Sequence, residues 1–308
     1  MNKRSNASKN NLYKIIAAVS LVIIVLALIA VELGYEFTNP NKTAQTFALE
    51  DNNIAVHFID VGQGDCEIIQ TKNMSAIIDS GESTAKDTVL SYIKSLGIKR
   101  FDYVIATHPH SDHIGTMDSI INNFQVGTVI MPKLENSLVP ITTAYESLLN
   151  AINAKGLKIH SALPDETYDL DGATLKILAP INDYDELNDY SVVCKLTYGE
   201  RSFLFTGDAQ NTAEADIIAK YSGSLNADVL KVGHHGSYTS TTKEFLSEIA
   251  PQYAVISCGV GNDYGHPNKS VIKRLSGVKI LRTDELGSIV FTTDGNTLQY
   301  KTFFGGSK

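Results

Sequence analysis

The sequence is poor in cysteine and has no tryptophan, and the few cysteines limit what the chain can be. Cys66, Cys194 and Cys258 are odd in number and widely spaced, which excludes a disulfide framework. No two of them form a CxxC pair, so a metal site built from cysteines is not expected. Each lies in or beside an apolar run, and we predict three buried structural thiols.

A basic surface is missing as well. The first 31 residues hold four of the 26 Lys and Arg residues and none of the 34 Asp and Glu residues. The remaining chain therefore carries 22 basic against 34 acidic residues, a net charge of −12. Such a surface does not attract polyanions as a whole. A role on nucleic acid would need a local basic patch or bound metal ions.

Acidic residues are absent from the N-terminus, where four basic residues precede an uncharged run from Ile15 to Val31. As a helix this run would be roughly 26 Å long, enough to cross a bilayer core. By the positive-inside rule we predict a cytoplasmic segment at 1–14, one membrane anchor at 15–33 and the rest of the chain outside the cytoplasmic membrane. The alternative is a cleaved signal peptide and a secreted protein, but no small-residue cleavage site follows the run.

The rest of the chain has the composition of a folded domain. Its 308 residues are 43% hydrophobic and 19% charged, which allows a sizeable core. Residues 34–53 are polar and are interpreted as a linker, and we place the folded domain at 54–304. Short runs rich in β-branched residues outnumber the segments with helical periodicity. This mixture predicts an α/β (α+β) fold of two sheets with helices on their outer faces.

Two segments show the same order of features. Residues 66–81 and 192–208 each contain a strand, a tight turn, a second strand and an aspartate near a glycine. Hairpins of this kind are common. Chance similarity therefore explains the echo at least as well as two related halves.

The densest cluster of titratable side chains is THPHSDH, residues 107–113. If the chain is extended there, His108 and His110 point to the same side, and Asp112 and His113 follow where a helix begins. Imidazole and carboxylate ligands suit Zn, Mn or Fe(II). A polar loop without a function is the alternative, but the specificity of the pattern HxHxDH favours a metal site.

Four further candidates also follow apolar, strand-like runs. Asp208 ends SFLFTGD, His234 and His235 end DVLKVGHH, and His266 lies in a loop after YAVISC. Neighbouring histidines in an extended strand point to opposite sides, so one of His234 and His235 is predicted to be a ligand. Taken singly, each candidate can be a turn or surface residue. Together, groups at strand ends can gather at one edge of a sheet stack.

The other polar residues of interest have simpler explanations. His57 lies within a strand and His160 in the run KIHSA, and we expect packing or surface roles for both. Asp79 ends a strand in IIDSG. It either turns the chain or orients a metal-ligating histidine from behind.

These motifs resemble the metallo-β-lactamase superfamily, whose HxHxDH signature matches residues 108–113. IIDSG, FTGD and the HH pair resemble its other motifs, in the right order. The chain is more similar still to the C-terminal hydrolase domain of ComEC-type competence proteins, in FIDVGQGD (58–65), NDYSVV (188–193), LFTGDA, KVGHHGS and YGHP. The resemblance covers about residues 54–300. No multi-span channel is visible in this sequence, so DNA uptake by this chain alone is not implied.

The resemblance implies a four-layer αββα sandwich with one or two divalent ions, Zn or Mn, at its edge. His108 and His110 would hold one ion and Asp208 would bridge the two. The second ion would also be held by Asp112, His113 and one of His234 and His235. The superfamily usually has a further histidine before the bridging aspartate. NDYS stands there instead, so Asn188 or Asp189 would line the site, and an enzyme with a single ion is one outcome.

Positions in the motifs also imply roles around the metals. Asp112 would orient an attacking water that loses its proton near neutral pH. Gly236 and Ser237 would hold a phosphate, and His266 would protonate the leaving oxygen.

The implied function is a membrane-anchored, extracytoplasmic, metal-dependent phosphodiesterase, with DNA or another phosphodiester as its substrate. A small phosphodiester or an envelope component such as phosphocholine is an alternative, although choline-binding repeats are absent. A lactam or lactone is disfavoured by the missing histidine. A non-catalytic tethered metal-binding module is disfavoured by the nearly complete ligand set. Beyond the membrane and the substrate, no protein partner can be inferred.

Overall fold

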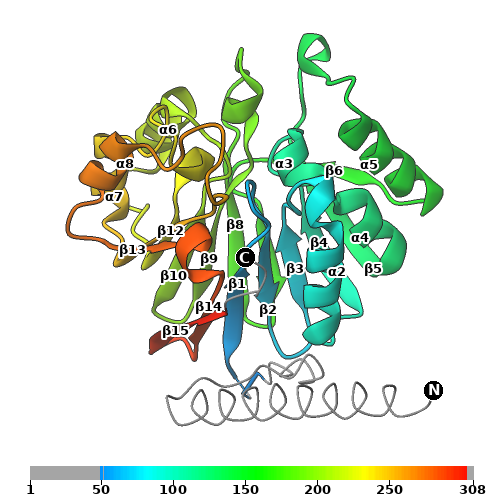
Figure 1. The fold of residues 1–308 in the computed structure, drawn as a ribbon, viewed down its shortest axis with the longest axis horizontal. Helices are drawn as coiled ribbons and strands as arrows, with labels where there is room; N and C mark the ends of the chain where they lie inside the picture. The colour runs from blue at the N-terminus through cyan, green and yellow to red at the C-terminus, as the bar shows by residue number, and fades with distance from the viewer. Residues whose placement is uncertain (1–48, 51, 304–308) are drawn as a thin grey trace, which may run out of the picture. The chain divides into compact units, whose positions relative to one another are not determined.

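Apolar strands supply most of the core, and they form two sheets (Figure 1). The computed structural model describes residues 49–50 and 52–303. The first sheet has the strand order β15-β14-β1-β2-β3-β4-β5-β6, and the second has the order β13-β12-β11-β10-β9-β8-β7. Each sheet contains a run of parallel strands, β3 to β6 in the first and β10 to β13 in the second.

The strands of the first sheet are β1 (Ile54–Phe58), β2 (Glu67–Gln70), β3 (Ser75–Ile78), β4 (Arg100–Ile105), β5 (Gln125–Met131), β6 (Ile159–Ser161), β14 (Ser288–Thr293) and β15 (Leu298–Phe303). Those of the second are β7 (Thr167–Leu170), β8 (Ala173–Ala179), β9 (Val193–Tyr198), β10 (Arg201–Phe205), β11 (Val229–Lys231), β12 (Tyr253–Ile256) and β13 (Lys279–Arg282).

The α-helices are α2 (Lys86–Ser95), α3 (Ser111–Ile114), α4 (Met117–Asn123), α5 (Thr143–Ala154), α6 (Asn211–Tyr221), α7 (Lys243–Ile249), α8 (Lys269–Arg274) and α9 (Thr283–Leu286). Four short 3-10 helices are η1 (Ser83–Ala85), η2 (Asn136–Leu138), η3 (Leu187–Tyr190) and η4 (Gly233–Gly236).

The inner faces of the two sheets share one core. Phe58 of β1 stacks on Phe205 of β10 with ring centroids 6.0 Å apart, and Phe291 of β14 packs edge-on against Phe58. Helices α2, α4 and α5 cover the outer face of the first sheet, and α6, α7 and α8 cover that of the second (Figure 1). The predicted four-layer αββα sandwich is confirmed.

The two segments with the same order of features are the hairpins β2–β3 and β9–β10, one in each sheet. The three cysteines are free and buried, as predicted. The short apolar runs of the sequence form β1 to β6 and β8 to β12, and the segments with helical periodicity form α2 and α4 to α7. Strands β7, β13, β14 and β15 and helices α8 and α9 were not predicted.

The predicted membrane anchor, residues 15–33, lies outside the described residues, as does the segment 1–14. Within the described part of the chain, none of the helices combines the length and the apolar character that a bilayer span requires. The first strand, β1, begins at Ile54.

Candidate metal centre

The predicted ligands come from loops at the carboxyl ends of parallel strands. His108 and His110 follow β4, and α3, which begins directly afterwards, carries Asp112 and His113. Asp208 follows β10 in the second sheet. Because the two sheets face each other, these loops bring groups from both halves of the fold to one edge.

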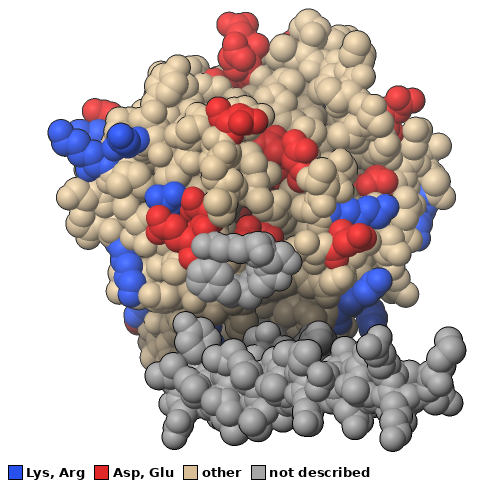
Figure 2. All heavy atoms as spheres, viewed as in Figure 1, with Lys and Arg blue, Asp and Glu red and all other residues tan. Residues whose placement is uncertain are grey.

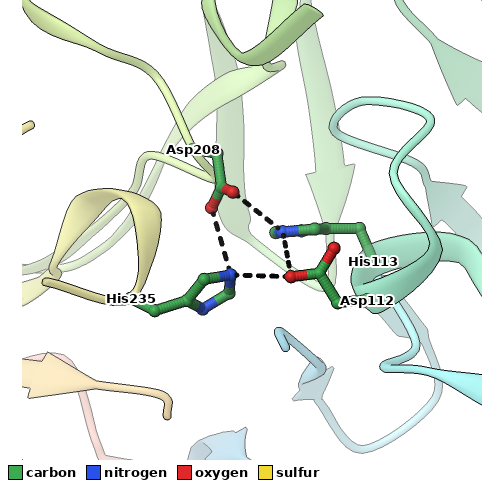
Figure 3. A group of neighbouring side chains, drawn as sticks. All are labelled: Asp112, His113, Asp208 and His235. Carbon is green, nitrogen blue, oxygen red and sulfur yellow. Dashed lines mark ion pairs between the residues drawn. The ribbon is translucent and has the colours of Figure 1, made fainter. Parts of the chain in front are cut away.

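One group of four side chains is shown in Figure 3: Asp112, His113, Asp208 and His235. Its potential ligand atoms all lie within 4.8 Å of one another. The Oδ2 of Asp208 is 3.3 Å from Nε2 of His113, and the Oδ2 of Asp112 is 3.2 Å from Nε2 of His235. Two imidazoles and two carboxylates at this spacing form a suitable ligand set for a divalent transition metal.

A second group consists of His108, His110 and again Asp208. The Nε2 of His108 lies 3.0 Å from Nδ1 of His110 and 3.8 Å from Oδ2 of Asp208. Asp208 therefore belongs to both groups, which is the arrangement needed for a carboxylate that bridges two ions. The structure thus brings together six of the predicted ligands: His108, His110, Asp112, His113, Asp208 and His235.

The chemistry of these atoms fits bound cations. Nε2 of His113, Nε2 of His235 and Oδ1 of Asp208 are buried and have no hydrogen-bond partner. Unpaired buried polar atoms are rare and costly in folded proteins. Here three of them belong to the same group of four and face one another, so coordination of an ion would satisfy all three.

The electrostatics differ between the two groups. Burial would lower the pKa values of His113 and His235, but Asp208 and the neighbouring carboxylates raise both above the ordinary value, so a cation has to displace protons there. Burial, followed by the neighbouring histidines, lowers the pKa of His108 well below its usual value, and burial likewise lowers the pKa of His110. Both are therefore neutral near pH 7, the form that binds metals. Burial alone would raise the pKa of Asp208, but His113 and His235 beside it hold that pKa well below its ordinary value.

The sequence-based prediction for His234 and His235 needs correction. Strand β11 ends at Lys231, and both histidines lie in η4 with left-handed backbone angles, φ 50° and 54°. Both consequently face the site instead of pointing to opposite sides. His235 belongs to the group of four, while Nε2 of His234 lies 3.5 Å from Oδ2 of Asp208. Such backbone angles cost about 1–3 kcal/mol each for a non-glycine residue and are typical of functional sites.

Asp79 lies behind His113. Its Oδ2 is 2.7 Å from Nδ1 of His113, and its two oxygens also accept hydrogen bonds from the backbone N–H and the hydroxyl of Thr107. With Nδ1 of His113 bound in this way, Nε2 faces the group of four. This geometry is the one expected for a carboxylate that orients a metal ligand.

A second buried carboxylate, Asp65, was not assigned a role from the sequence. Its Oδ2 is 2.7 Å from Nζ of Lys231, and its Oδ1 is 3.2 Å from Nδ1 of His235. Lys231 is only 1% exposed, and Glu67 is buried nearby. Nδ1 of His235 also contacts the carbonyl oxygen of Ser257 at 3.0 Å, which leaves Nε2 for the metal. The signals were Asp65 in FIDVGQGD and a lysine within the apolar strand DVLKV.

Gly64 makes the approach of this loop possible. Its φ is +131°, and a Cβ there would collide with the carbonyl oxygen of Asp112. The backbone N–H of Asp65 donates to the same oxygen at 3.2 Å. A glycine at this position therefore lets the loop after β1 support the loop that carries the ligands.

The NDYS segment supports the site through Ser191. Its hydroxyl accepts a hydrogen bond from the backbone N–H of Asp208 at 3.0 Å and lies 3.4 Å from Nδ1 of His108. Asp189 instead accepts hydrogen bonds from backbone N–H groups at the start of α6. Asn188 is not among the residues lining the pocket over the metal ligands, and its predicted contact with substrate remains a prediction.

The predicted phosphate-binding residues, Gly236 and Ser237, are also not among the lining residues. A Cβ at Gly236 would clash with Pro267, so this glycine allows two loops to pack. The hydroxyl of Ser237 is 3.0 Å from that of Thr239, which in turn lies 3.4 Å from Nδ1 of His234. Their roles toward substrate likewise remain predictions.

An open cavity of about 470 Å³ lies over the ligands and is lined by His110, Asp112, Asp208, His234 and His235. His266 lines it as well, with its ring centroid 5.6 Å from that of His234. Burial, and then the neighbouring His235 and His234, lower the pKa of His266 to about 4. This size is within the usual range for small-molecule sites, about 300–1,000 Å³.

The histidines not assigned to the site lie elsewhere. His57 is buried in β1 and contacts the hydroxyl of Tyr92 at 3.0 Å. His160 is on the surface and pairs with Glu166 at 3.0 Å. Both placements confirm the packing and surface roles expected for them.

Over most of its length the chain is similar in sequence to a part of two curated proteins. It is 29% identical over 257 residues to ComE operon protein 3 of Bacillus subtilis, covering 77% of this chain and 32% of that protein. It is 31% identical over 249 residues to competence protein ComA of Neisseria gonorrhoeae, covering 79% of this chain and 33% of that protein. The chain thus spans about a third of the length of the curated relatives it matches.

Solved structures share the fold at low identity. The metallo-beta-lactamase fold protein YhfI from Bacillus subtilis superposes with a TM-score of 0.52 at 16% identity, covering 78% of this chain and all of that one. CmlA, a diiron beta-hydroxylase from Streptomyces venezuelae, superposes with a TM-score of 0.50 at 16% identity, covering 76% of this chain and 53% of that one. Residues 59–260 match the metallo-beta-lactamase superfamily. The fold, the ligand geometry and this match together show that the chain belongs to the metallo-beta-lactamase superfamily.

Proposed function

We propose that the protein is a metal-dependent phosphodiesterase that holds two divalent ions, Zn or Mn. The observation that carries the proposal is the position of Asp208 in both ligand groups, at the base of an open cavity. Two ions at such a site would supply a water of lowered pKa and neutralise negative charge on phosphoryl oxygens.

The residues around the ions have separate tasks in this proposal. His108 and His110 hold one ion, and His113 and His235 hold the other, with Asp208 between them. Asp112 is the more exposed carboxylate of the group of four, with 21% of its side chain accessible. It therefore reaches the cavity and orients the attacking water. His266 lines the same cavity, but its pKa is lowered to about 4, so it is neutral near pH 7 and would donate a hydrogen bond to the leaving oxygen in place of the full proton expected from the sequence.

The relatives support DNA as the first substrate to test, because two of them are ComE operon protein 3 and competence protein ComA. The N-terminal basic residues and the apolar run at 15–33 support a protein held in the cell membrane, with its N-terminus in the cytoplasm and the hydrolase domain outside. Cleavage of the N-terminal segment would release the same domain as a secreted enzyme.

A small phosphodiester or an envelope component is a second candidate. Among the described residues lining the cavity there is no Lys or Arg, so a long polyanion gains no direct ion pairs there. A non-catalytic metal-binding module finds less support, since a water-accessible cavity opens onto the ligands.

Degradation of DNA by the full chain tests the proposal. Metal-stripped protein would be loaded with Mn or Zn, and bound metal would be counted by elemental analysis. We expect metal-dependent cleavage that is lost in His110→Ala. Folded, metal-loaded protein that cleaves neither DNA nor any small phosphodiester would refute the phosphodiesterase assignment.

A further inference from the structure

The loop between β12 and α8 forms one wall of the cavity and is held in a fixed shape. The side chain of Asn262 accepts a hydrogen bond from the N–H of His266 at 3.0 Å and donates to the carbonyl oxygens of His266 and Gly259. The N–H of Gly259 donates to Gln63, which lies on the loop after β1 and lines the cavity. The loop is therefore tied internally and to the opposite sheet.

This loop presents an aromatic side chain to the cavity. Tyr264 lines the cavity although it is 71% exposed. Its ring stacks on that of His266 with centroids 5.7 Å apart and planes inclined by 21°. Tyrosine is common at contact surfaces, because its ring supplies apolar area while its hydroxyl stays hydrogen-bonded to water. His266 covers one side of this ring, so a single broad face remains free beside the metal ligands.

The charge around the cavity limits what that face can bind. Leu187 lines the cavity, and the residues just before it include Asp183, Asp185 and Glu186, which line an adjoining hollow. In the view of Figure 2, acidic side chains are exposed along the upper middle of the face, and the Lys and Arg side chains lie nearer its sides. A substrate phosphate would therefore depend on the bound ions for its charge partners, and affinity must come from uncharged contacts.

We propose that Tyr264 is a specificity-determining residue that stacks on the unpaired base next to the scissile phosphodiester of a nucleotide substrate. This inference rests on the phosphodiesterase function proposed above and narrows its substrate class. Base–aromatic stacking needs no charge and accepts any base, since every base has a flat face. Bases inside a duplex are stacked on their neighbours, so single strands and frayed ends are the preferred substrates.

A cationic headgroup is the competing ligand for an aromatic ring beside acidic residues. Sites for quaternary ammonium groups are aromatic cages that surround the cation. Tyr264 is the one tyrosine, phenylalanine or tryptophan among the described residues lining the cavity. One free face suits a planar base better than a roughly spherical cation.

The test compares thymidylyl-thymidine with analogues in which either base is replaced by an abasic sugar. The full chain loaded with Mn would be used, with Tyr264→Ala and Tyr264→Phe. Tyr238→Ala is the matched control. Tyr238 is also 71% exposed and lies just after η4, but it does not line the cavity. The methyl ester of deoxyribose 5-phosphate, a phosphodiester without an aromatic ring, reports hydrolysis without a base, and p-nitrophenylphosphorylcholine reports the cationic alternative.

We expect Tyr264→Ala to lower kcat/KM for the dinucleotide by about ten- to hundred-fold, and Tyr264→Phe and Tyr238→Ala to change it little. Removing one of the two bases should lower kcat/KM for the unsubstituted protein to a similar degree. On that abasic analogue, Tyr264→Ala should change kcat/KM little further. The methyl ester should be unaffected by Tyr264→Ala.

Three results would overturn the inference. Equal losses on the dinucleotide and the methyl ester would show that Tyr264 supports the site in general. A choline ester that is the better substrate and depends more on Tyr264 would assign the ring to a cation. Hydrolysis of the methyl ester together with unchanged dinucleotide hydrolysis in Tyr264→Ala would leave the phosphodiesterase function intact and remove the stacking role. Hydrolysis of none of the substrates would instead refute the function itself.

Discussion

Hairpins β2–β3 and β9–β10 lie in different sheets, yet each leads into an aspartate, and the two aspartates lie at opposite edges of one imidazole. Asp79 lies 2.7 Å from Nδ1 of His113, and Asp208 lies 3.3 Å from its Nε2. Both oxygens of Asp79 have hydrogen-bond partners within the protein. Oδ1 of Asp208 has none.

The difference separates two tasks that similar sequences perform. An aspartate whose oxygens are all bound to protein groups can only hold its neighbour in place. An aspartate with a buried, unpaired oxygen still needs a cation. Asp65 is intermediate between them: its Oδ2 is paired with Lys231, whereas its Oδ1 has no hydrogen-bond partner and lies 3.2 Å from Nδ1 of His235. Mutations on the two sides of His113 should therefore have different effects.

The largest expected effect is that of Asp208→Asn. An amide has neither the charge nor the second acceptor oxygen needed to bridge two cations. We expect activity on a phosphodiester to fall by at least about 1,000-fold and the bound metal to drop by one or two ions per chain. Elemental analysis of the purified variant gives the metal count. A variant that keeps its full metal content and activity would contradict the bridging assignment.

Lys231→Met should come next, with its main effect on folding. The substitution leaves Asp65 buried without its cation, and breaking a buried ion pair on one side costs about 3–5 kcal/mol. The free energy of unfolding in urea measures this loss. Lys231→Arg is the charge-preserving comparison. The double variant Asp65→Asn with Lys231→Met should recover part of the stability, and no recovery would show that the lysine acts on something other than Asp65.

Asp79→Asn is expected to have a smaller effect than Asp208→Asn and of another kind. Loss of the carboxylate behind a ligating histidine typically lowers metal affinity or activity by about 10- to 100-fold. We expect Asp79→Asn to regain most of its activity at saturating metal, and Asp208→Asn to stay inactive there. A titration of activity against metal concentration distinguishes the two variants. If Asp79→Asn stays inactive at every metal concentration, Asp79 does more than orient His113.

Glu67→Gln should have the smallest effect, and one that depends on pH. Burial, and then the neighbouring Asp65, raise the pKa of Glu67 well above its usual value. An acid with a raised folded-state pKa costs stability as the pH rises above its unfolded value of about 4.3. Glu67→Gln should therefore match the unsubstituted protein within about 0.5 kcal/mol near pH 4 and become relatively more stable as the pH rises. Urea unfolding across this range checks the sign.

The sequence predicts the sandwich and the residues at its metal-binding edge because both have short-range signals. Apolar runs predict the inner strands, and HxHxDH places four candidate ligands in one loop. The edge strands β7, β13 and β15 are partly exposed and contain one β-branched residue each, so a search for runs rich in such residues does not detect them. Strand β14 is apolar and buried, so the sequence does contain a strand signal there, and the prediction missed it.

The layer behind the ligands could not be predicted in the same way. Asp65 and Lys231 are 166 positions apart, and their pairing depends on how the two sheets face each other. The turn of η4 is a further case. Nothing in VGHHGS shows that two non-glycine residues adopt left-handed angles, and extended geometry was the reasonable expectation.

The sharing of ligands between the two sheets has a consequence for how the protein matures. His108, His110, Asp112 and His113 follow β4, whereas Asp208 and His235 are supplied about a hundred residues later, in the second sheet. An ion held by this set is a cross-link between the two halves. It can form only after both halves are made and docked, so metal uptake is a late step of assembly that reports a completed fold.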